Sequence, residues 1–526
     1  MQDGRYLNRD LSRVVKQSAR GSLVLVAGQV ISTIVSALGM IYVSRVLGST
    51  SFGIVAIAQI PIGFAYILMN LGTDQALIKY IAQYKYEDRT ENIRLLMESG
   101  LFISLVMGLF YTLLLWFSSG YLASSVFQQP ELETLIKIFS LGVVGQSVIT
   151  TAWAIILGYE RMTLKSLNII VYSVLKSLVG PILVYLGYGP VGAVIGETGP
   201  LIFSCVLSLV FIYFIWSSER HSKATMSHLE VTKMLLVYGF PLFLANLVTG
   251  PRPQINSYLL SVYVTADLIG NYSVAMRFSA LVGLIVTPIS QVILPLFSKL
   301  ESNLEDLKLV YQASVKYTSL LVFPIVAAIM ATSPQIIQIL YDQDYAQASL
   351  YMRLYLSTYF FIGIGLLSNQ RLLNSRSLTR ITFNSTFLQT VVTLPITFLL
   401  VQRYGVVGML VSELVGPRIG MLYGIWEIRR NFGFIFDLRA SLTLFLSSFS
   451  AFIVATFMLD ALTLNLWVEL VLGCAVTLLA YIIGIIVLKA LTLGDLRNMS
   501  SLSDTFGPLS RAFRMFLGFL ERFVDE

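Results

Sequence analysis

Apolar residues in this chain fall into long continuous runs separated by short polar connections. Each run is about 20 residues long, which is the length at which an α-helix crosses the hydrocarbon core of a bilayer. Fourteen spans are expected, at residues 22–46, 52–71, 96–117, 135–157, 167–186, 191–216, 234–262, 269–296, 317–331, 350–372, 381–401, 406–428, 442–459 and 466–488. The pattern therefore predicts an all-α integral membrane protein with about 14 transmembrane helices.

A sequence repeat divides these spans into two halves. Seven residues recur 216 positions later: Thr163, Asn168, Tyr188, Gly189, Val191, Gly192 and Glu197 match Thr379, Asn384, Tyr404, Gly405, Val407, Gly408 and Glu413. Upstream, Gly53 and Ala58 return 217 positions later as Gly270 and Ala275. Many transporters place their substrate site between two duplicated bundles, so the repeat favours transport. Chance matching is the alternative, because Gly and Val are abundant in this chain.

The repeat predicts two pseudo-symmetric six-helix lobes followed by an appended pair of helices. The expected parts are a cytoplasmic N-terminal segment at 1–21, an N-lobe at 22–216, a cytoplasmic linker at 217–233, a C-lobe at 234–428, spans thirteen and fourteen within 429–488, and a cytoplasmic tail at 489–526. In the tail, Phe513, Phe516, Leu517, Leu520 and Phe523 share one helical face. This predicts an amphipathic helix on the inner leaflet, or alternatively a helix packed on a cytoplasmic loop.

Charge patterning predicts the orientation of the spans. Lys and Arg collect before the first span and after every even-numbered span, whereas the other connections hold few of them. By the positive-inside rule both termini are expected in the cytoplasm, with the chain in the cell membrane. The formal net charge of +7 is then explained by basic loops that orient the protein and lie near the lipid head groups. Because the basic residues are spread over many short loops, a nucleic-acid partner is not expected.

Composition narrows the class further. With 56% hydrophobic and 12% charged residues and a mean hydropathy of +0.77, the chain is too apolar for a soluble globule. Cys205 and Cys474 lie in apolar runs, and His221 and His228 share one loop, so neither a disulfide framework nor a metal site is expected. No Gly-rich phosphate-binding loop with its Lys is present in the sequence, so no nucleotide or other cofactor is expected.

Several segments carry a family resemblance. They are "YVSRVLGSTSFGIVAIAQ", "LGTDQALIKYIAQY", "ILGYERM", "YGFPLFLANL", "ADLIGNYSVAMRFSAL" and "IIQILYDQDYAQA". From about residue 20 to residue 488 the chain resembles the polysaccharide transporter branch of the multidrug/oligosaccharidyl-lipid/polysaccharide (MOP) exporter superfamily, in the manner of Wzx-type flippases. The resemblance implies two lobes around a cavity that opens alternately to each side. It also implies transfer of a polyprenyl- or dolichyl-linked oligosaccharide between leaflets, with membrane lipids and glycan-assembly enzymes as partners.

Six charged residues at membrane depth are the main site candidates, because a charge there is costly unless it is paired, hydrated or facing a cavity. They are Lys176, Glu197, Arg252, Arg277, Glu413 and Arg418. Four cations against two acids leave a net positive interior, which suits a lipid phosphate or pyrophosphate. For Lys176 the alternative is neutralisation of Glu197. Glu197 and Glu413 are expected either to pair with cations or to couple transport to an ion, and Arg277 has the alternative of snorkelling.

Arg252 is the first candidate for the phosphate contact. Pro251 and Pro253 remove backbone donors, so span seven is expected to be broken there, and broken helices at depth line binding cavities. The alternative is an Arg that pairs with Glu413 or another acid to hold helices together. Gln254 and Asn256 are candidates for hydrogen bonds to sugar hydroxyls, although such residues also bridge helices.

Three functions compete on the sequence alone. A lipid-linked oligosaccharide flippase is favoured by the net positive interior. A multidrug exporter would prefer an acidic or aromatic cavity, and the first span holds Gln29 rather than an acid. A membrane-embedded glycosyltransferase or polymerase needs catalytic acids and a sizeable external loop, whereas the external connections are short. No catalytic residue is therefore expected, and the energy source stays open.

Overall fold

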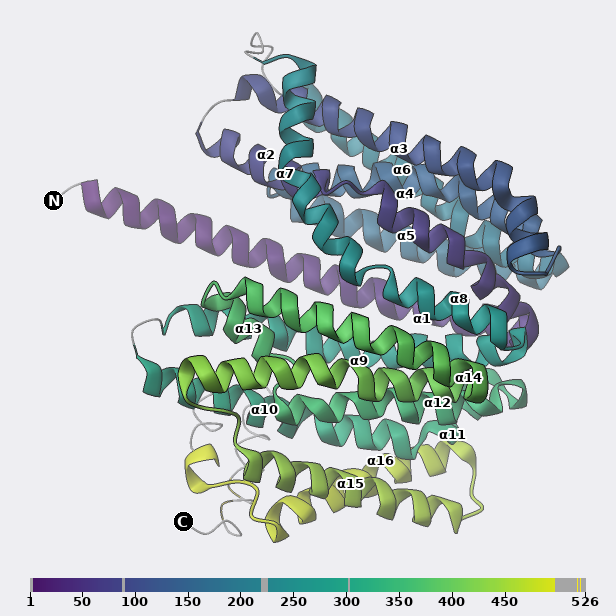
Figure 1. Ribbon diagram of the computed structural model, residues 1–526, viewed down its shortest axis with the longest axis vertical. Coiled ribbons are helices and arrows are strands. Elements are labelled where there is room, and N and C mark those ends of the chain that lie inside the picture. The colour runs from purple at the N-terminus through teal and green to yellow at the C-terminus, as the bar shows by residue number, and fades with distance from the viewer. Residues whose placement is uncertain are drawn as a thin grey trace. The chain divides into compact units, whose positions relative to one another are not determined.

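The computed structural model describes residues 3–87, 90–218, 226–300 and 303–496, together with Gly518 and Glu521. Helices account for all regular structure in this part of the chain, and it contains no strand. The main helices are α1 (Asp3–Met69), α2 (Thr73–Tyr86), α3 (Ile93–Tyr121), α4 (Leu132–Gly158), α5 (Met162–Leu183), α6 (Gly189–Ser218), α7 (His228–Thr249), α8 (Arg252–Tyr263), α9 (Ala266–Ser298), α10 (Leu304–Ala331), α11 (Ser333–Tyr341), α12 (Ala346–Leu356), α13 (Ser368–Ser375), α14 (Thr379–Phe432), α15 (Leu438–Asp460) and α16 (Leu466–Val487) (Figure 1).

Ten helical stretches of the described chain are long and apolar enough to cross a membrane, or eleven if one bent pair is counted as a span. Three of them, Gly21–Met69, Met162–Ser217 and Thr379–Phe432, are 49, 56 and 54 residues long. A straight helix of 49 residues would measure about 74 Å, more than twice the roughly 30 Å of hydrocarbon. Each of the three covers two predicted spans, so the membrane class is confirmed, while the count of fourteen stays a prediction.

Glycines interrupt these long helical stretches. Two of them occupy equivalent positions of the sequence repeat and have nearly the same backbone angles. Gly189 has φ 53° and ψ −137°, and Gly405, 216 residues later, has φ 55° and ψ −133°. A side chain would clash in this conformation, which glycine alone adopts readily. The two halves therefore share an unusual backbone turn as well as a sequence pattern. Gly48, with φ 73° and ψ 167°, interrupts α1 between the first two predicted spans.

Span ten differs from its prediction. Instead of one helix over 350–372, the chain forms α12, the 3₁₀ segment Ser357–Ile364 and α13, and the axis bends by 46° between Gln343–Ile364 and Ser368–Ser375. Gly365 sits at the bend with φ 90°, and the hydroxyl of Tyr311 on α10 donates a hydrogen bond to Asn369 Oδ1 at 2.7 Å just after it. Hydrophobicity alone cannot distinguish these arrangements, because the same apolar run could form either.

The helices pack into two compact units, Met1–Ser273 and Val274–Glu526. In the first unit, α5 packs against α1 and α6, α4 against α3 and α6, and α2 against α4 and α7 (Figure 1). The predicted linker at 217–233 therefore lies within the first unit, and the proposed lobe boundaries stay a prediction. The expected segment 1–21 joins the first span as one helix from Asp3, whereas the predicted amphipathic face around Phe516 lies outside the described residues.

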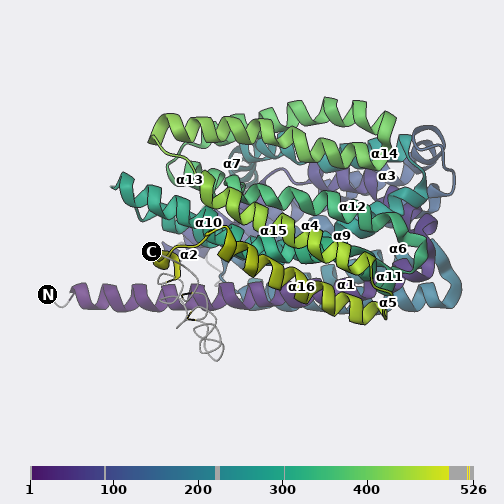
Figure 2. The ribbon, with the colours of Figure 1, turned by 90° about the horizontal axis from the view of Figure 1, so that it is seen from below.

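In the second unit, α15 and α16 lie side by side and both pack on α10, while α12 and α13 pack on α14 (Figure 2). A buried cluster joins α9, α10, α13 and α14 through residues such as Phe297, Tyr311 and Leu372.

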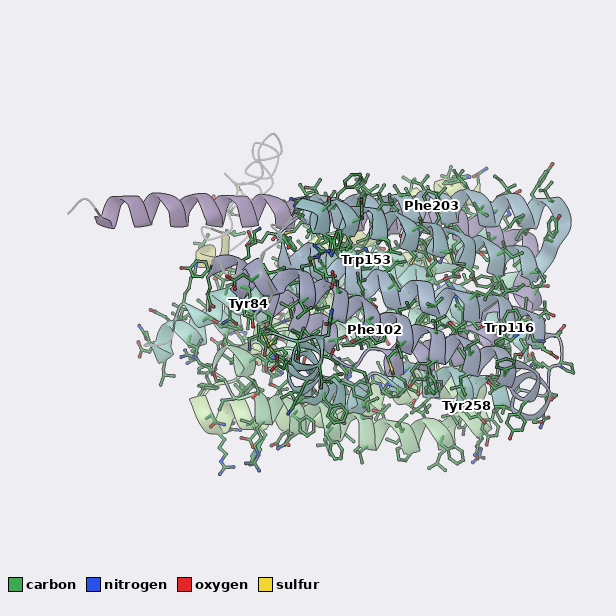
Figure 3. The ribbon with its side chains drawn as sticks, turned by 90° about the horizontal axis from the view of Figure 1, so that it is seen from above. Tyr84, Phe102, Trp116, Trp153, Phe203 and Tyr258 are labelled. Atoms are coloured by element: carbon green, nitrogen blue, oxygen red, sulfur yellow. The ribbon has the colours of Figure 1, made fainter. Side chains whose placement is uncertain are left out.

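Large apolar side chains lie on the outside of the first unit. Phe102 is 66% exposed, Phe203 53% and Trp116 37% (Figure 3). A soluble monomer rarely tolerates such extended apolar surface, whereas lipid tails solvate it. The outward-facing residues thus support the membrane assignment independently of helix length.

Candidate functional site

Two glycines bring the candidate residues of α5 and α6 together. A methyl group added to Gly196 on α6 would lie 2.2 Å from the Cα of Gly180 on α5, so the helix backbones touch at this crossing. Small residues permit such close approach in membrane helices. Lys176 lies one turn before Gly180, and Glu197 follows Gly196 directly. The crossing therefore sets these two charged side chains opposite each other.

Lys176 and Glu197 form an ion pair. Nζ of Lys176 is 2.8 Å from Oε1 of Glu197, and the two side chains are only 19% and 21% exposed. Gln59 on α1 donates from Nε2 to Oε2 of Glu197 at 2.9 Å. Each carboxylate oxygen thus has a donor within hydrogen-bond distance. Of the two roles left open for Lys176, the structure contains the ion pair with Glu197. Gln59, which also contacts Glu197, was not among the predicted residues.

The space beside this pair is small. A cavity of about 20 Å³ is lined by residues of α1, α5 and α6, including Ser36, Phe52, Lys176 and Glu197. That volume holds about one water molecule. A sugar does not fit there in this conformation.

Arg252 opens α8 after a kink. α7 ends at Thr249, and Gly250 and Pro251 keep right-handed helical angles of φ −60°, ψ −40° and φ −71°, ψ −20°. The predicted break is therefore present as a bend between two helices rather than as an unwound loop. Arg252 is half-buried at the start of α8, where backbone N–H groups at a helix N-terminus also favour an anion.

The two amides that follow Arg252 lie in helix contacts. A methyl group added to Gly63 on α1 would lie 2.4 Å from Cδ of Gln254, so the Gln254 amide packs directly on that glycine. Asn256 is 6% exposed. Both positions fit the helix-bridging alternative better than open sugar contacts. Arg277, half-buried on α9, lies within electrostatic range of Tyr341 on α11.

In the second unit, Arg418 stacks on an aromatic ring. Its guanidinium carbon is 3.9 Å from the ring centroid of Phe361, and its Nε donates to the Leu414 carbonyl of the same helix at 3.1 Å. This is a close cation–π geometry. Glu413 is half-buried on the same helix, α14. Phe361 was not among the predicted residues, because its 3₁₀ segment was expected to be part of a continuous transmembrane helix.

An apolar cavity adjoins Arg418. It has a volume of about 420 Å³, within the usual range of ligand pockets. Its lining is almost wholly hydrophobic and includes Met330, Phe360, Phe361, Leu414, Leu442, Phe445 and Phe449. Phe361 and Leu414, the two residues that hold the Arg418 side chain, both belong to that lining. A fixed cation thus lies beside a space suited to hydrocarbon.

The two halves of the repeat carry their cations at different places. Glu197 and Glu413 are equivalent, but position 392, the equivalent of Lys176, is Val, and position 202, the equivalent of Arg418, is Ile. The Lys176–Glu197 pair is therefore not duplicated in the second half. The two halves of the repeat therefore differ in which of these positions carry a cation.

One further acid was missed by the sequence analysis. Asp74 lies in the first turn of α2 and accepts a hydrogen bond from Asn70 Nδ2 at 2.7 Å. The segment "LGTDQAL" was used only as part of the family resemblance. An acid placed immediately after an apolar span, in a helix too short to cross the membrane, is the signal that could have identified it.

Comparisons with known proteins agree with this architecture. A family model described as "polysaccharide biosynthesis protein" matches residues 42–350. The chain is 22% identical over 413 residues to a putative O-antigen transporter of Shigella flexneri, covering 77% of this chain and 96% of that protein. It is 21% identical over 309 residues to the succinoglycan biosynthesis transport protein ExoT of Rhizobium meliloti, covering 58% of each.

Solved structures show the same fold. The lipid II flippase MurJ in an inward closed conformation has a TM-score of 0.70 at 18% identity, covering 88% of this chain and 98% of MurJ. An inward-facing multidrug resistance MATE transporter of the MOP superfamily has a TM-score of 0.64 at 19% identity, covering 76% and 94%. The resemblance inferred from the sequence is confirmed. Since the family model covers more than half of its residues, this chain belongs to the polysaccharide biosynthesis protein family of membrane proteins.

Proposed function

We propose that this protein moves a polyprenyl- or dolichyl-linked oligosaccharide from the cytoplasmic to the outer leaflet of the cell membrane by alternating access, without catalysing a reaction of its own. The family and the named transport proteins among its relatives support transport in polysaccharide biosynthesis. Glycan-assembly enzymes that make the substrate and consume the product are the proposed partners.

The observation that carries this proposal is Arg418 beside the apolar cavity of the second unit. A lipid-linked oligosaccharide has a hydrocarbon chain joined to a phosphate or pyrophosphate. The cavity offers the chain an apolar surface, and the guanidinium offers the phosphate a planar set of donors. Arg252, at the start of α8, is proposed as a second phosphate contact, whereas Lys176 is proposed to serve the Glu197 pair.

The proposed orientation has both termini in the cytoplasm, supported by the Lys and Arg distribution of the sequence. A Cys introduced at Ser222 and a reporter fused after Glu526 should both be protected from impermeant reagents added outside intact cells. Labelling at either position from outside would contradict the proposed orientation, and with it the assigned sides of the connections and the proposed direction of transport.

The function is tested with the purified protein in vesicles that contain a fluorescent polyprenyl-pyrophosphate-linked trisaccharide. Loss of signal to a membrane-impermeant quencher reports flipping. We expect flipping by the native chain, loss in Arg418→Ala and Arg252→Ala, and partial activity in Arg418→Lys and Arg252→Lys. Arg430→Ala is the matched control, because Arg430 is an exposed cation over the ring of Trp426 at 5.4 Å.

Other outcomes would favour the competing functions. No flipping of the glycolipid together with efflux of cationic dyes would favour a multidrug exporter. Elongation or transfer of the trisaccharide by the pure protein would favour a glycosyltransferase or polymerase.

A further inference from the structure

Asp74, in α2, interacts with groups from the preceding connection and from two other helices of the first unit. Besides the Asn70 amide at 2.7 Å, its Oδ1 faces the hydroxyl of Thr151 on α4 at 3.4 Å. Lys165 on α5 acts on it electrostatically. The Lys165 ammonium, however, lies over the ring of Trp153 at 5.2 Å from the centroid. Asp74 therefore has neutral hydrogen-bond donors and a cation that is engaged elsewhere.

This arrangement differs from that of Glu197. The Glu197 carboxylate receives an ammonium at 2.8 Å and an amide at 2.9 Å, so losing its charge would strand Lys176. Burial raises the pKa of Asp74, and the hydrogen bonds from Asn70 and Thr151 and the charge of Lys165 oppose that rise only in part. Of these two acids, Asp74 is the one that can gain a proton without leaving a cation in direct contact unpaired.

The surroundings of α2 connect Asp74 to the helix that leads to Arg252. A methyl group added to Gly72 would lie 2.1 Å from the carbonyl oxygen of Gly239 on α7. Farther along α2, the Lys79 ammonium lies 4.2 Å from the ring centroid of Tyr238, which also contacts Tyr80. α7 and α3 otherwise meet α2 through apolar side chains of a buried cluster. α2 and α7 are therefore in close contact along their length, including one direct backbone approach.

We propose that Asp74 is a proton-binding site through which transport is coupled to protons, an inference that rests on the proposed function. A proton from water neutralises the carboxylate and turns one of its oxygens into a donor. The attraction to Lys165 is lost, and Asn70 and Thr151 then face a protonated carboxyl group, which donates one hydrogen bond as well as accepting them. The attachment of α2 to α4 through Asp74 and Thr151 weakens, and the contact of Gly72 with Gly239 carries the change to α7.

A spectroscopic test detects the proton without reference to transport. The infrared carbonyl band of a protonated carboxyl group is followed while the purified native protein is titrated with acid. We expect a band that Asp74→Asn removes and Asp74→Glu restores at a shifted position, with a midpoint above the value of about 3.9 for a free Asp. Glu133→Gln, which changes a partly exposed acid paired with Lys137, is the matched control and should leave the band. A band unaffected by Asp74→Asn, or a midpoint at or below the free value, overturns the proposal.

A transport test separates the proposal from the function on which it rests. In the vesicle assay with the fluorescent trisaccharide lipid, a pH gradient should accelerate native flipping. Asp74→Asn should flip at a rate that no longer depends on the gradient, whereas Asp74→Glu and Glu133→Gln should keep that dependence. Flipping by Asp74→Asn that still follows the pH gradient overturns the coupling while leaving the function intact, as does acceleration by a sodium gradient alone. If the native chain does not flip the lipid, the function fails, and the infrared titration decides the proton site.

Discussion

Gly53 and Gly270 make the same contact from opposite halves of the repeat. A methyl group added to Gly53 on α1 would lie 1.7 Å from the carbonyl oxygen of Ala266, and one added to Gly270 on α9 would lie 2.0 Å from that of Ser49. Ser49 and Ala266 are themselves 217 positions apart, as are the glycines. The contact is therefore self-complementary, as at a two-fold interface. The Ser49 hydroxyl also donates a hydrogen bond to Asp267 across it.

Replacing Gly53 by Ala should force this contact open, because a backbone carbonyl cannot rotate away as a flexible side chain can. We expect Cys residues placed at Ser49 and Ala266 to cross-link efficiently in the native background and several-fold less with Gly53→Ala or Gly270→Ala. Gly199→Ala is the control, since no atom lies within 4 Å of the added methyl group. Equal cross-linking in all backgrounds would show that the contact is not close in the membrane.

The Lys176–Glu197 pair should be energetically coupled. Glu197→Gln leaves a largely buried ammonium without its carboxylate and should lower stability, and the double variant with Lys176→Gln should recover much of the loss. A double-mutant cycle on thermal unfolding is expected to give a coupling of about 1 to 3 kcal/mol. The same cycle on Lys137 and Glu133, which are 37% and 45% exposed, should give less than about 1 kcal/mol. Equal couplings in the two cycles would argue against the packing described for α5 and α6.

The ring beneath Arg418 should matter for glycolipid transfer. Phe361→Leu keeps an apolar cavity wall but removes the aromatic face that positions the guanidinium. A contact of this kind contributes about 0.5 to 2 kcal/mol, so a fall in flipping rate of roughly 2- to 30-fold is expected. Phe449→Leu, on the same cavity but without the cation, is the control. A larger loss in the control would mean that cavity shape, and not the stacked cation, decides the rate.

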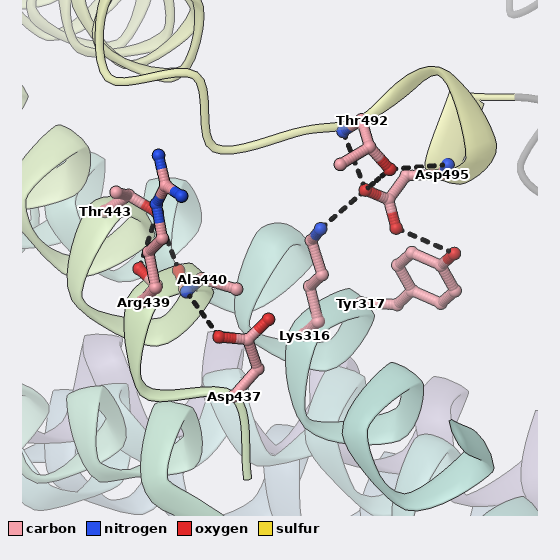
Figure 4. A network of polar contacts seen from close by, with 8 residues as sticks. All are labelled: Lys316, Tyr317, Asp437, Arg439, Ala440, Thr443, Thr492 and Asp495. Atoms are coloured by element: carbon pink, nitrogen blue, oxygen red, sulfur yellow. Dashed lines mark hydrogen bonds and ion pairs between the residues drawn. The ribbon is translucent and has the colours of Figure 1, made fainter. Parts of the chain in front are cut away.

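A polar network after the last helix should make stability depend on pH. Asp495 accepts from Lys316 Nζ at 2.5 Å, and Tyr317 and Thr492 also donate to it (Figure 4). Burial raises the pKa of Asp495, but the hydrogen bonds and charge of Lys316 and the hydrogen bonds of Thr492 outweigh it, so the pKa is lowered overall.

Because the folded-state pKa of Asp495 is lowered, its stabilisation is present above the free value of about 3.9 and is lost as pH falls through the folded pKa. At neutral pH Asp495→Asn should unfold at a lower temperature than the native protein in the same detergent, and the difference should shrink as the pH falls below the free value of about 3.9. Asp460→Asn, at the other end of the α15–α16 pair, serves as a comparison. A difference that stays constant with pH would exclude the ion pair as its source.

The membrane class and the repeat could be predicted because they depend on residue type and spacing alone. Apolar runs of fixed length require helices in lipid, and the register of Gly189 with Gly405 was visible before their shared backbone angles were known. The bend in span ten was not predictable in this way, since Gly365 is one of 37 glycines in the chain and residue type alone does not indicate its φ of 90°.

The charged residues of the site could be identified from the sequence, but the side chains that contact them could not. Lys176 and Glu197 were identified as neighbours because they lie on consecutive helices. Gln59 and Phe361 were not, since their roles depend on contacts with α6 and α14 that the sequence does not encode locally. Asp74 was overlooked because an acid beside an apolar run resembles an ordinary loop residue until Thr151 and Lys165 are placed around it.

The matching angles of Gly189 and Gly405 have a consequence for how the chain can evolve. In the repeat, the positions of Lys176 and Glu197 correspond to Val392 and Glu413, yet both turns share a conformation that residues with a side chain rarely adopt. We therefore expect substitutions of side chains inside the bundles to be tolerated more often than substitutions of these two glycines. In a library of random variants, depletion should fall on both positions alike, 216 codons apart.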